Sequence, residues 1–167
     1  ASGSTVEFWL KKSEWIPSLT TKEVIFDLWN NQATSVGDYG RLRIEMSNAS
    51  PPFAVTYRSG SVGFTDEALG DSTVQATIND TGWHHYAISF ISESAGFGAS
   101  LYVDGELNNT VTYTAAAINE ITGALVATGG ALQTATADVA GAGLGYGKLS
   151  ASLDEFRYWK TSRNAEQ

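Results

Sequence analysis

Alternation of apolar and polar residues runs through most of the chain, and it constrains the fold more than any other feature. Residues two apart on a β-strand point to the same face of a sheet, so an alternating run predicts a strand with one buried face. Many of these runs are rich in β-branched and aromatic residues, which favour strands. The runs that predict strands are 5–11, 23–29, 41–46, 53–58, 73–78, 83–91, 100–103, 107–113 and 153–159.

Turn signals separate the predicted strands. Asp104-Gly105 is a two-residue hairpin signal, because both turn positions need a positive φ that Asp and Gly tolerate. The Ala-, Gly- and Thr-rich stretch 115–147 is expected to hold short strands joined by glycine turns. So many short strands predict an all-β chain, an antiparallel two-sheet jelly-roll sandwich. A helix is expected at most as a short C-terminal one that begins in 161–167.

Composition and charge exclude several classes of protein. The chain has 167 residues, which fits one domain with a real hydrophobic core. Cysteine is absent, which excludes disulfides, thiolate metal ligands and cysteine nucleophiles. The formal net charge of −8 argues against non-specific binding to nucleic acid. No apolar run approaches the roughly 18 residues of a membrane span, so no membrane insertion is expected.

Basic residues are missing from the middle of the chain. Residues 59–147 contain nine acids and no Lys or Arg, so no Lys or Arg salt bridge forms inside this stretch. The plain interpretation is a polar surface with scattered acids. The alternative is a surface that binds cations or is adapted to high salt.

Four sequence blocks, in this order, carry a family resemblance: 5–11, 82–87, 101–105 and 153–159, the last leading to 164–166. Together they resemble the laminin G-like domains of the concanavalin A-like lectin/glucanase superfamily. The resemblance covers nearly the whole chain and implies two curved sheets packed as a jelly roll, with Trp83 buried between them. The family usually has an earlier strand before the first block. We therefore expect residues 1–167 to be a single domain excised from a longer chain.

The catalytic pattern of the superfamily's enzymes is not met. Its retaining glucanases resemble one another in a strand motif of Glu, Asp two residues on, and Glu two or three further, which places nucleophile and acid about 5 Å apart. Asp66-Glu67 and Asp154-Glu155 each lack a third acid at the needed offset. Adjacent residues on a strand also point to opposite faces of the sheet. We therefore expect no enzyme.

A metal site is the remaining cofactor question. His84 and His85 are neighbours on a predicted strand and point to opposite faces, so they are not expected to chelate one metal. Many domains of the superfamily hold one Ca²⁺ through loop acids and backbone carbonyls, and oxygen ligands suit that ion. The resemblance thus implies one Ca²⁺ as the candidate cofactor, with Asp38 or Asp154 as ligand, although no calcium loop is spelled out.

The leading functional hypothesis is a non-catalytic, lectin-like recognition and adhesion module on an exterior surface. The resemblance implies a glycan or a partner protein as ligand. Exposed aromatic rings stack on sugars while amides and charged groups bind their hydroxyls. The candidate ligand-binding residues, chosen for that combination, are Trp29, Asn30, Asn31, Asp38, Tyr39, Tyr57 and Arg58. The competing interpretation, in which Trp29 and Tyr57 belong to the core, stays open.

Two other functions remain as alternatives. One is an architectural subunit of a virion or surface assembly, in a capsid, fibre or decoration role, which would contact neighbouring subunits. Few charges and an Ala/Gly/Thr-rich composition suit that role. The other is a degenerate glucanase. The expected location is accordingly extracellular, on a cell surface or on a virion.

Overall fold

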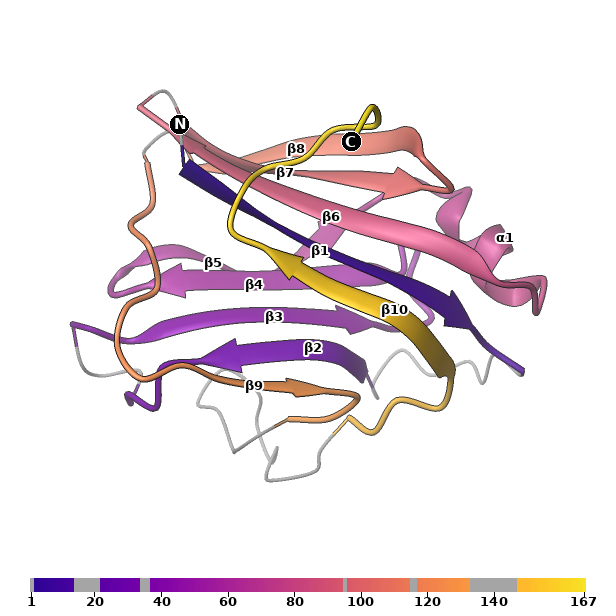
Figure 1. The fold of residues 1–167 in the computed structure, drawn as a ribbon, viewed down its shortest axis with the longest axis horizontal. Helices are drawn as coiled ribbons and strands as arrows, with labels where there is room; N and C mark the ends of the chain where they lie inside the picture. The colour runs from indigo at the N-terminus through magenta and orange to yellow at the C-terminus, as the bar shows by residue number, and fades with distance from the viewer. Residues whose placement is uncertain (1, 14–21, 34–36, 95, 115–116, 133–146) are drawn as a thin grey trace.

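Two five-stranded antiparallel sheets pack face to face in this computed structural model, which describes residues 2–13, 22–33, 37–94, 96–114, 117–132 and 147–167 (Figure 1). The first sheet, sheet A, has the order β10-β1-β6-β7-β8, and the second, sheet B, has the order β5-β4-β3-β2-β9. The predicted all-β, two-sheet jelly-roll sandwich is confirmed.

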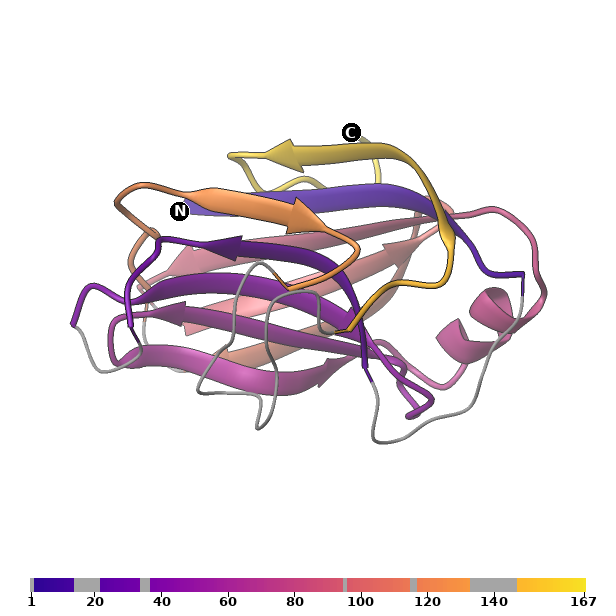
Figure 2. The same cartoon turned by 90° about the horizontal axis from the view of Figure 1, so that it is seen from below.

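The strands of sheet A come from both ends and the middle of the chain. They are β1 (Ser2–Lys11), β6 (His84–Glu93), β7 (Gly96–Val103), β8 (Glu106–Thr114) and β10 (Ser152–Trp159). Those of sheet B are β2 (Glu23–Trp29), β3 (Gly40–Met46), β4 (Phe53–Ser59), β5 (Val62–Leu69) and β9 (Val126–Gly129). β10 and β9 are edge strands on the same side of the sandwich (Figure 2).

The core lies between the sheets, and strand alternation directs every second side chain of the central strands into it. Phe8 of β1 pairs with Tyr86 of β6, and both rings are fully buried. Leu42 and Ile44 of β3 face them from sheet B as members of the same buried cluster. The register of the β7–β8 hairpin is set by Asp104 (φ 51°) and Gly105 (φ 85°), as the Asp-Gly signal predicts.

The structure corrects two predictions about helix. The run 73–78 is not a strand, because it contains the short helix α1 (Val74–Asn79). Val74 and Ile78 are both buried, and a spacing of four residues belongs to one face of a helix. Residues 161–167 form no helix, since the Arg163 amide donates to the hydroxyls of Thr5 and Ser89. Within the described ranges, no helix has the length and apolarity to cross a membrane.

The expected burial of Trp83 between the sheets is wrong. Its side chain is 43% exposed. Trp83 precedes the first residue of β6 and stands an odd number of positions from Tyr86, Ile88 and Phe90, whose side chains fill the core. By strand alternation, an odd separation from a core position points outward. Of the strands expected in 115–147, β9 is present, and residues 133–146 lie outside the described part of the chain.

Candidate functional site

The face of sheet B that points away from the core carries charged side chains that are buried. Along β3 the apolar residues enter the core, so Arg41, Arg43 and Glu45 point the other way. None of the three is more than 1% exposed. Because burying a charge is costly unless it is paired, the partners of these groups matter. We call this surface the arginine face, formed by Asp27, Trp29, Arg41, Arg43, Glu45, Thr56 and Arg58.

Asp27 and Arg41 form a two-pronged ion pair on this face. Nε of Arg41 donates to Oδ1 of Asp27 at 2.7 Å, and Nη2 donates to Oδ2 at 2.6 Å. Parallel hydrogen bonds of this kind fix the orientation of the guanidinium group and also neutralise its charge. The Arg41 side chain is thereby held in one position on the sheet.

Arg43 stands at the centre of a second charged group. Its Nε lies 2.9 Å from Oε2 of Glu45, and its Nη2 lies 3.3 Å from both Oδ1 of Asp66 and Oγ1 of Thr56. Lys22 adds an ion pair of 2.7 Å to Asp66. Nη1 of Arg43 and Oε1 of Glu45 are buried without a hydrogen-bond partner among the described residues. This group therefore retains unused hydrogen-bonding capacity.

Burial and neighbouring charges act in opposite directions on these carboxyls. Desolvation raises the pKa of Glu45, although the charges of Arg43 and Lys22 oppose it. Burial also pushes the pKa of Asp66 upward, but the hydrogen bond and charge of Lys22 and the charge of Arg43 hold that pKa below its usual value. Asp66 is therefore ionised at neutral pH, while Glu45 is the weaker acid of the group.

Trp29, Arg41 and Arg58 form one row across three strands at the end of this face. Arg41 is the register partner of both other residues. Its guanidinium carbon lies 5.7 Å from the centre of the Trp29 ring, a cation–π distance. Trp29 and Arg58 are half-buried, and Nε of Arg58 finds no hydrogen-bond partner within the described ranges. The row therefore joins two partly exposed side chains, Trp29 and Arg58, to the fixed ion pair of Arg41 and Asp27.

The structure divides the seven residues predicted from the sequence among four environments. Trp29 and Arg58 lie together on the arginine face. Asn30 and Tyr39 are buried, each 2% exposed. The Asn30 amide donates to the carbonyls of Asp38 at 2.5 Å and Thr122 at 2.9 Å, so it ties the β2–β3 connection together.

Asn31 and Asp38 are exposed on the β2–β3 connection, close in sequence to the row that contains Trp29. Tyr57 points to the opposite side of sheet B. Its ring lies 5.5 Å from the ring of Phe90 and 4.8 Å from that of Phe97, between the sheets. The structure thus places Trp29 and Arg58 in one row, leaves Asn31 and Asp38 exposed on the adjoining connection, and puts Tyr57 on the other side of the sheet.

Sequence reasoning missed Asp27, Arg41, Arg43 and Glu45. The signal is present in β3, where three charges alternate with apolar residues in a strand that turns out to be central. A central strand pairs on both edges, so charges on its outer face sit against neighbouring strands and find partners there. The partners themselves depend on strand order, which the alternation pattern does not reveal.

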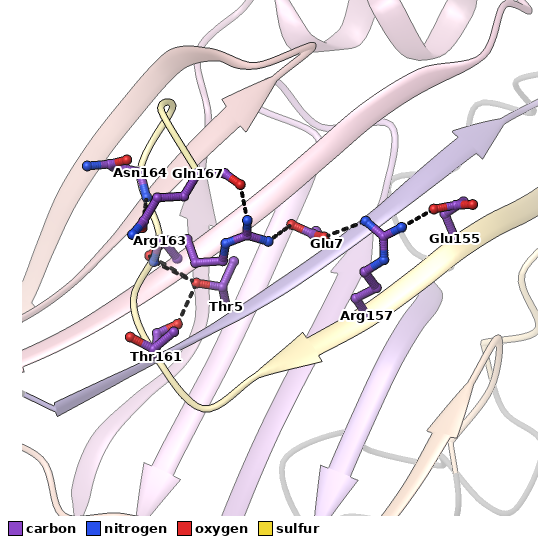
Figure 3. A network of polar contacts seen from close by, with 9 residues as sticks. Thr5, Glu7, Glu155, Arg157, Thr161, Arg163, Asn164 and Gln167 are labelled. Atoms are coloured by element: carbon purple, nitrogen blue, oxygen red, sulfur yellow. Dashed lines mark hydrogen bonds and ion pairs between the residues drawn. The ribbon is translucent and has the colours of Figure 1, made fainter.

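A second polar cluster lies on the outer face of sheet A, where residues 161–167 fold over β1 (Figure 3). Glu7 is buried and accepts hydrogen bonds from Nη1 of Arg157 at 3.1 Å and Nη1 of Arg163 at 3.2 Å. Arg157 also pairs with Glu155, and the Arg163 guanidinium lies 4.4 Å from the Trp159 ring centre. Because its charges are mutually satisfied, we interpret this cluster as a fastening for the C-terminal segment.

The expectation of Ca²⁺ is not tested by these contacts. The described residues contain no group of three His, Asp or Glu side chains placed to hold a metal ion. Oδ1 of Asp154 accepts the Glu155 amide at 2.8 Å, and Asp38 is exposed. His84 bridges the carboxylates of Asp80 and Asp104 through its two ring nitrogens. Calcium binding therefore stays a prediction.

Comparison with known proteins agrees with this architecture. A laminin G family model, described as the concanavalin A-like lectin/glucanases superfamily, matches residues 1–167. The chain belongs to this superfamily and is a laminin G-like domain. No curated protein matches it.

Several solved structures share the fold at low identity. The CBM40 module of the Ruminococcus gnavus IT-sialidase has a TM-score of 0.59 and 13% identity, covering 99% of this chain and 79% of that one. Domains LG4-5 of the mouse laminin alpha1 chain have a TM-score of 0.56 and 12% identity, covering 99% and 37%. The leech intramolecular trans-sialidase has a TM-score of 0.59 and 15% identity, covering 99% and 22%. Only a small part of that enzyme corresponds to this chain, and the likeness shows the fold alone.

Proposed function

We propose that this domain is a non-catalytic glycan-binding module whose ligand contacts the exposed end of the arginine face. The observation that carries the proposal is the row of Trp29, Arg41 and Arg58 across the outer side of sheet B. The Trp29 ring offers an apolar surface for the C–H face of a sugar, and Arg58 offers hydrogen-bond donors beside it. Asn31 and Asp38 add polar groups on the adjoining connection.

Arg58 favours an acidic sugar. The other bases on and beside the arginine face, Lys22, Arg41 and Arg43, are paired with acids there, and Asp38 adds a further acid on the adjoining connection. Arg58 has no ion pair among the described residues, so its guanidinium is the one that would meet a carboxylate of the ligand. Guanidinium groups match the geometry of a carboxylate, so a sugar acid gains more here than a neutral sugar. The same Ruminococcus module is described in complexes with α2,3- and α2,6-sialyllactose, which supports the choice of acidic glycan.

Calorimetric titration with 3′-sialyllactose, 6′-sialyllactose and lactose tests the proposal. We expect at least one sialyllactose to bind more tightly than lactose. Trp29→Ala and Arg58→Ala should each weaken that binding about tenfold or more, since each removes a direct contact worth roughly 1.4 kcal/mol or more. Trp83→Ala is the matched control, because Trp83 is an exposed tryptophan outside the arginine face. Absence of binding on a broad glycan array, or full affinity in both variants, would contradict the proposal.

The proposed module binds rather than hydrolyses its glycan. The sequence lacks the carboxylate triplet of the superfamily's glucanases, and the carboxylates of the arginine face are occupied by arginine and lysine. We therefore expect no turnover of laminarin, lichenan or sialyllactose. Turnover that one Asp or Glu substitution abolishes would overturn this part of the proposal.

A location outside the cell, on a secreted or surface protein, fits this function and the nature of the structural relatives. A protein ligand in place of a glycan would appear in the same experiments as a failure of every sugar tested. The architectural role in a virion or surface assembly rests on composition and stays a prediction.

A further inference from the structure

Residues of both sheets line a cavity between them. The connection 117–125, which also lines it, lies at the end of the sandwich opposite α1 (Figure 1). The volume of the cavity is about 300 Å³, at the lower end of the range for small-molecule sites. Strands of both sheets and the connection 117–125 supply its walls. The apolar lining is Leu28, Phe90, Phe97, Ile118, Ile121 and Leu125.

One region of the cavity is polar. Ser4, Tyr57, Tyr158 and Glu120 all line it, and they lie near enough for their charges and hydrogen bonds to influence one another. Ser4 is only 5% exposed, and its hydroxyl lies near enough to the Tyr158 phenol to influence the pKa of that group, but the two atoms do not form a hydrogen bond of good geometry. A buried hydroxyl without a firm partner is uncommon in folded proteins and marks a place where a ligand atom or water completes the bonding.

The two tyrosines serve as neutral hydrogen-bond groups in this region. Burial, with the neighbouring Tyr158 and Glu120, raises the pKa of Tyr57 to about 12, so its phenol keeps its proton at neutral pH. Tyr158 is half-exposed at the opening, and burial likewise raises its pKa. The cavity thus combines an aromatic and aliphatic interior with hydroxyl groups that donate and accept hydrogen bonds.

We propose that this cavity is a second binding site, one that takes an uncharged molecule of one or two aromatic rings with a single hydroxyl. The rings would pack against Phe90, Phe97 and Leu28, because aromatic pairs gain from offset and edge contacts. The hydroxyl would meet Ser4 and the tyrosines. An ion is disfavoured because most of the walls are apolar, and the two charged side chains that line the cavity, Glu120 and Lys160, carry opposite charges.

This site is independent of the proposed glycan function. The cavity lies between the sheets, whereas the arginine face lies on the outer side of sheet B. Loss of one kind of binding therefore leaves the other intact, and the two proposals fail separately.

Fluorescence titration of the whole chain with 6-propionyl-2-(dimethylamino)naphthalene, an uncharged probe with two aromatic rings, tests the cavity. We expect a saturable rise in emission with one probe bound per chain. Leu125→Arg should weaken binding at least tenfold, because it places a guanidinium at the opening beside Glu120. Leu107→Arg is the matched control and should bind normally, since Leu107 is exposed on β8 and does not line the cavity.

Circular dichroism and melting curves establish that both variants fold. If Leu125→Arg does not fold, Ile121→Trp takes its place in the experiment. The indole ring would fill the cavity, so this variant should also exclude the probe. The proposal is overturned if wild-type binding does not saturate, or if the folded cavity variants bind as well as Leu107→Arg.

Competition by naphthalene and 2-naphthol tests the polar region. In wild type, 2-naphthol gains a hydrogen bond that naphthalene cannot make, and the ratio of their two dissociation constants measures its contribution. Ser4→Ala should shift that ratio against naphthol by roughly threefold to tenfold, the effect of one net hydrogen bond. Ser100→Ala, on the outer face of sheet A, should leave the ratio unchanged. An unchanged ratio in Ser4→Ala would overturn the assignment of the hydroxyl.

Discussion

At the scale of single residues, the arginines of β3 show how a sheet holds charge away from water. Arg41 is 1% exposed, and both prongs of its guanidinium reach Asp27. Such a pair adds little net stability over apolar residues of the same shape, but breaking it leaves an uncompensated charge. The pair is thus better explained by the position it gives to Arg41 under Trp29 than by the stability it adds.

Asp27→Ala should therefore destabilise the fold by about 3–5 kcal/mol, the usual cost of leaving one partner of a buried ion pair. Urea unfolding measures the change. Glu155→Ala is the control, because its partner Arg157 is half-exposed and an exposed pair contributes at most about 1 kcal/mol. A loss for Asp27→Ala as small as that of the control would mean that water reaches Arg41.

His84 predicts a pH dependence of stability. Partial burial lowers its pKa, but the hydrogen bonds and charges of Asp104 and Asp80 outweigh that effect and raise the pKa above 6.5. A raised folded-state pKa stabilises the fold fully below the unfolded value and loses that contribution as the pH rises through the folded value. We expect chemical unfolding to show greater stability at pH 6 than at pH 8.5.

The contribution of His84 is isolated by comparing variants across the same pH range. His84→Gln should lose part of the stabilisation at low pH, because glutamine keeps hydrogen-bonding groups but carries no titrating charge. His85→Gln should behave as wild type, because it is the His84 ring, and not the His85 ring, that contacts the carboxylates of Asp80 and Asp104. Identical pH profiles in all three proteins would rule out the charged bridge.

At the scale of elements, the Glu7 carboxylate binds the last segment of the chain together with hydroxyl groups of β1 and β6. Glu7 binds both Arg157 of β10 and Arg163, while the Arg163 amide donates to Thr5 and Ser89 (Figure 3). Glu7→Ala should loosen residues 161–167 and speed hydrogen exchange at the Arg163 amide. Arg157 keeps its second partner in that variant, so β10 should stay paired with β1. Unchanged exchange at Arg163 would show that the two hydroxyl acceptors suffice.

The same scale shows what the sequence predicts and what it does not. The sequence patterns located β2 and β10 to within one residue at each end, although β2 is buried on both of its faces and most of β10 is exposed. They missed β5 (Val62–Leu69), where an extra residue between Phe64 and Glu67, opposite Val55 and Tyr57 of β4, breaks the alternation. They also assigned α1 to a strand, since two apolar residues in six positions suit either period.

The candidate site was predictable only in part for the same physical reason. Turn-proximal aromatic and amide residues are visible in the sequence, which led to Trp29 and Arg58. Their neighbour Arg41 and its partner Asp27 come from adjacent strands, and only the register of β2 against β3 brings them together. Tyr57 was chosen as a surface residue but lies between the sheets. Which face of the sheet a side chain occupies decides whether it can reach a surface ligand, and the sequence alone did not give that face.

At the scale of the whole molecule, the absence of bases from residues 59–147 acquires a structural meaning. Asp66 forms ion pairs with Lys22 and Arg43, which come from outside that stretch. Asp80 and Asp104 both pair with His84. Other acids of the stretch have no ion pair among the described residues: Glu67, Asp71, Glu93, Glu106 and Glu120. Their mutual repulsion is a property of the folded surface as a whole.

The melting temperature should therefore rise with NaCl between low ionic strength and about 0.1 M, where the screening length falls to about 10 Å. Glu93→Gln combined with Glu106→Gln should raise the melting temperature at low salt and flatten its salt dependence. Glu155→Gln is the control, because it removes a carboxylate that is paired with Arg157, and it should not flatten the curve. A melting temperature independent of salt in wild type would show that repulsion between these acids does not affect stability.

CaCl₂ and MgCl₂ compared at equal ionic strength separate screening from the predicted calcium site, since a ligand at about 100 times its Kd adds about 2.7 kcal/mol to the free energy of unfolding. Equal effects of the two salts would exclude a specific site for Ca²⁺ and leave surface repulsion as the cause.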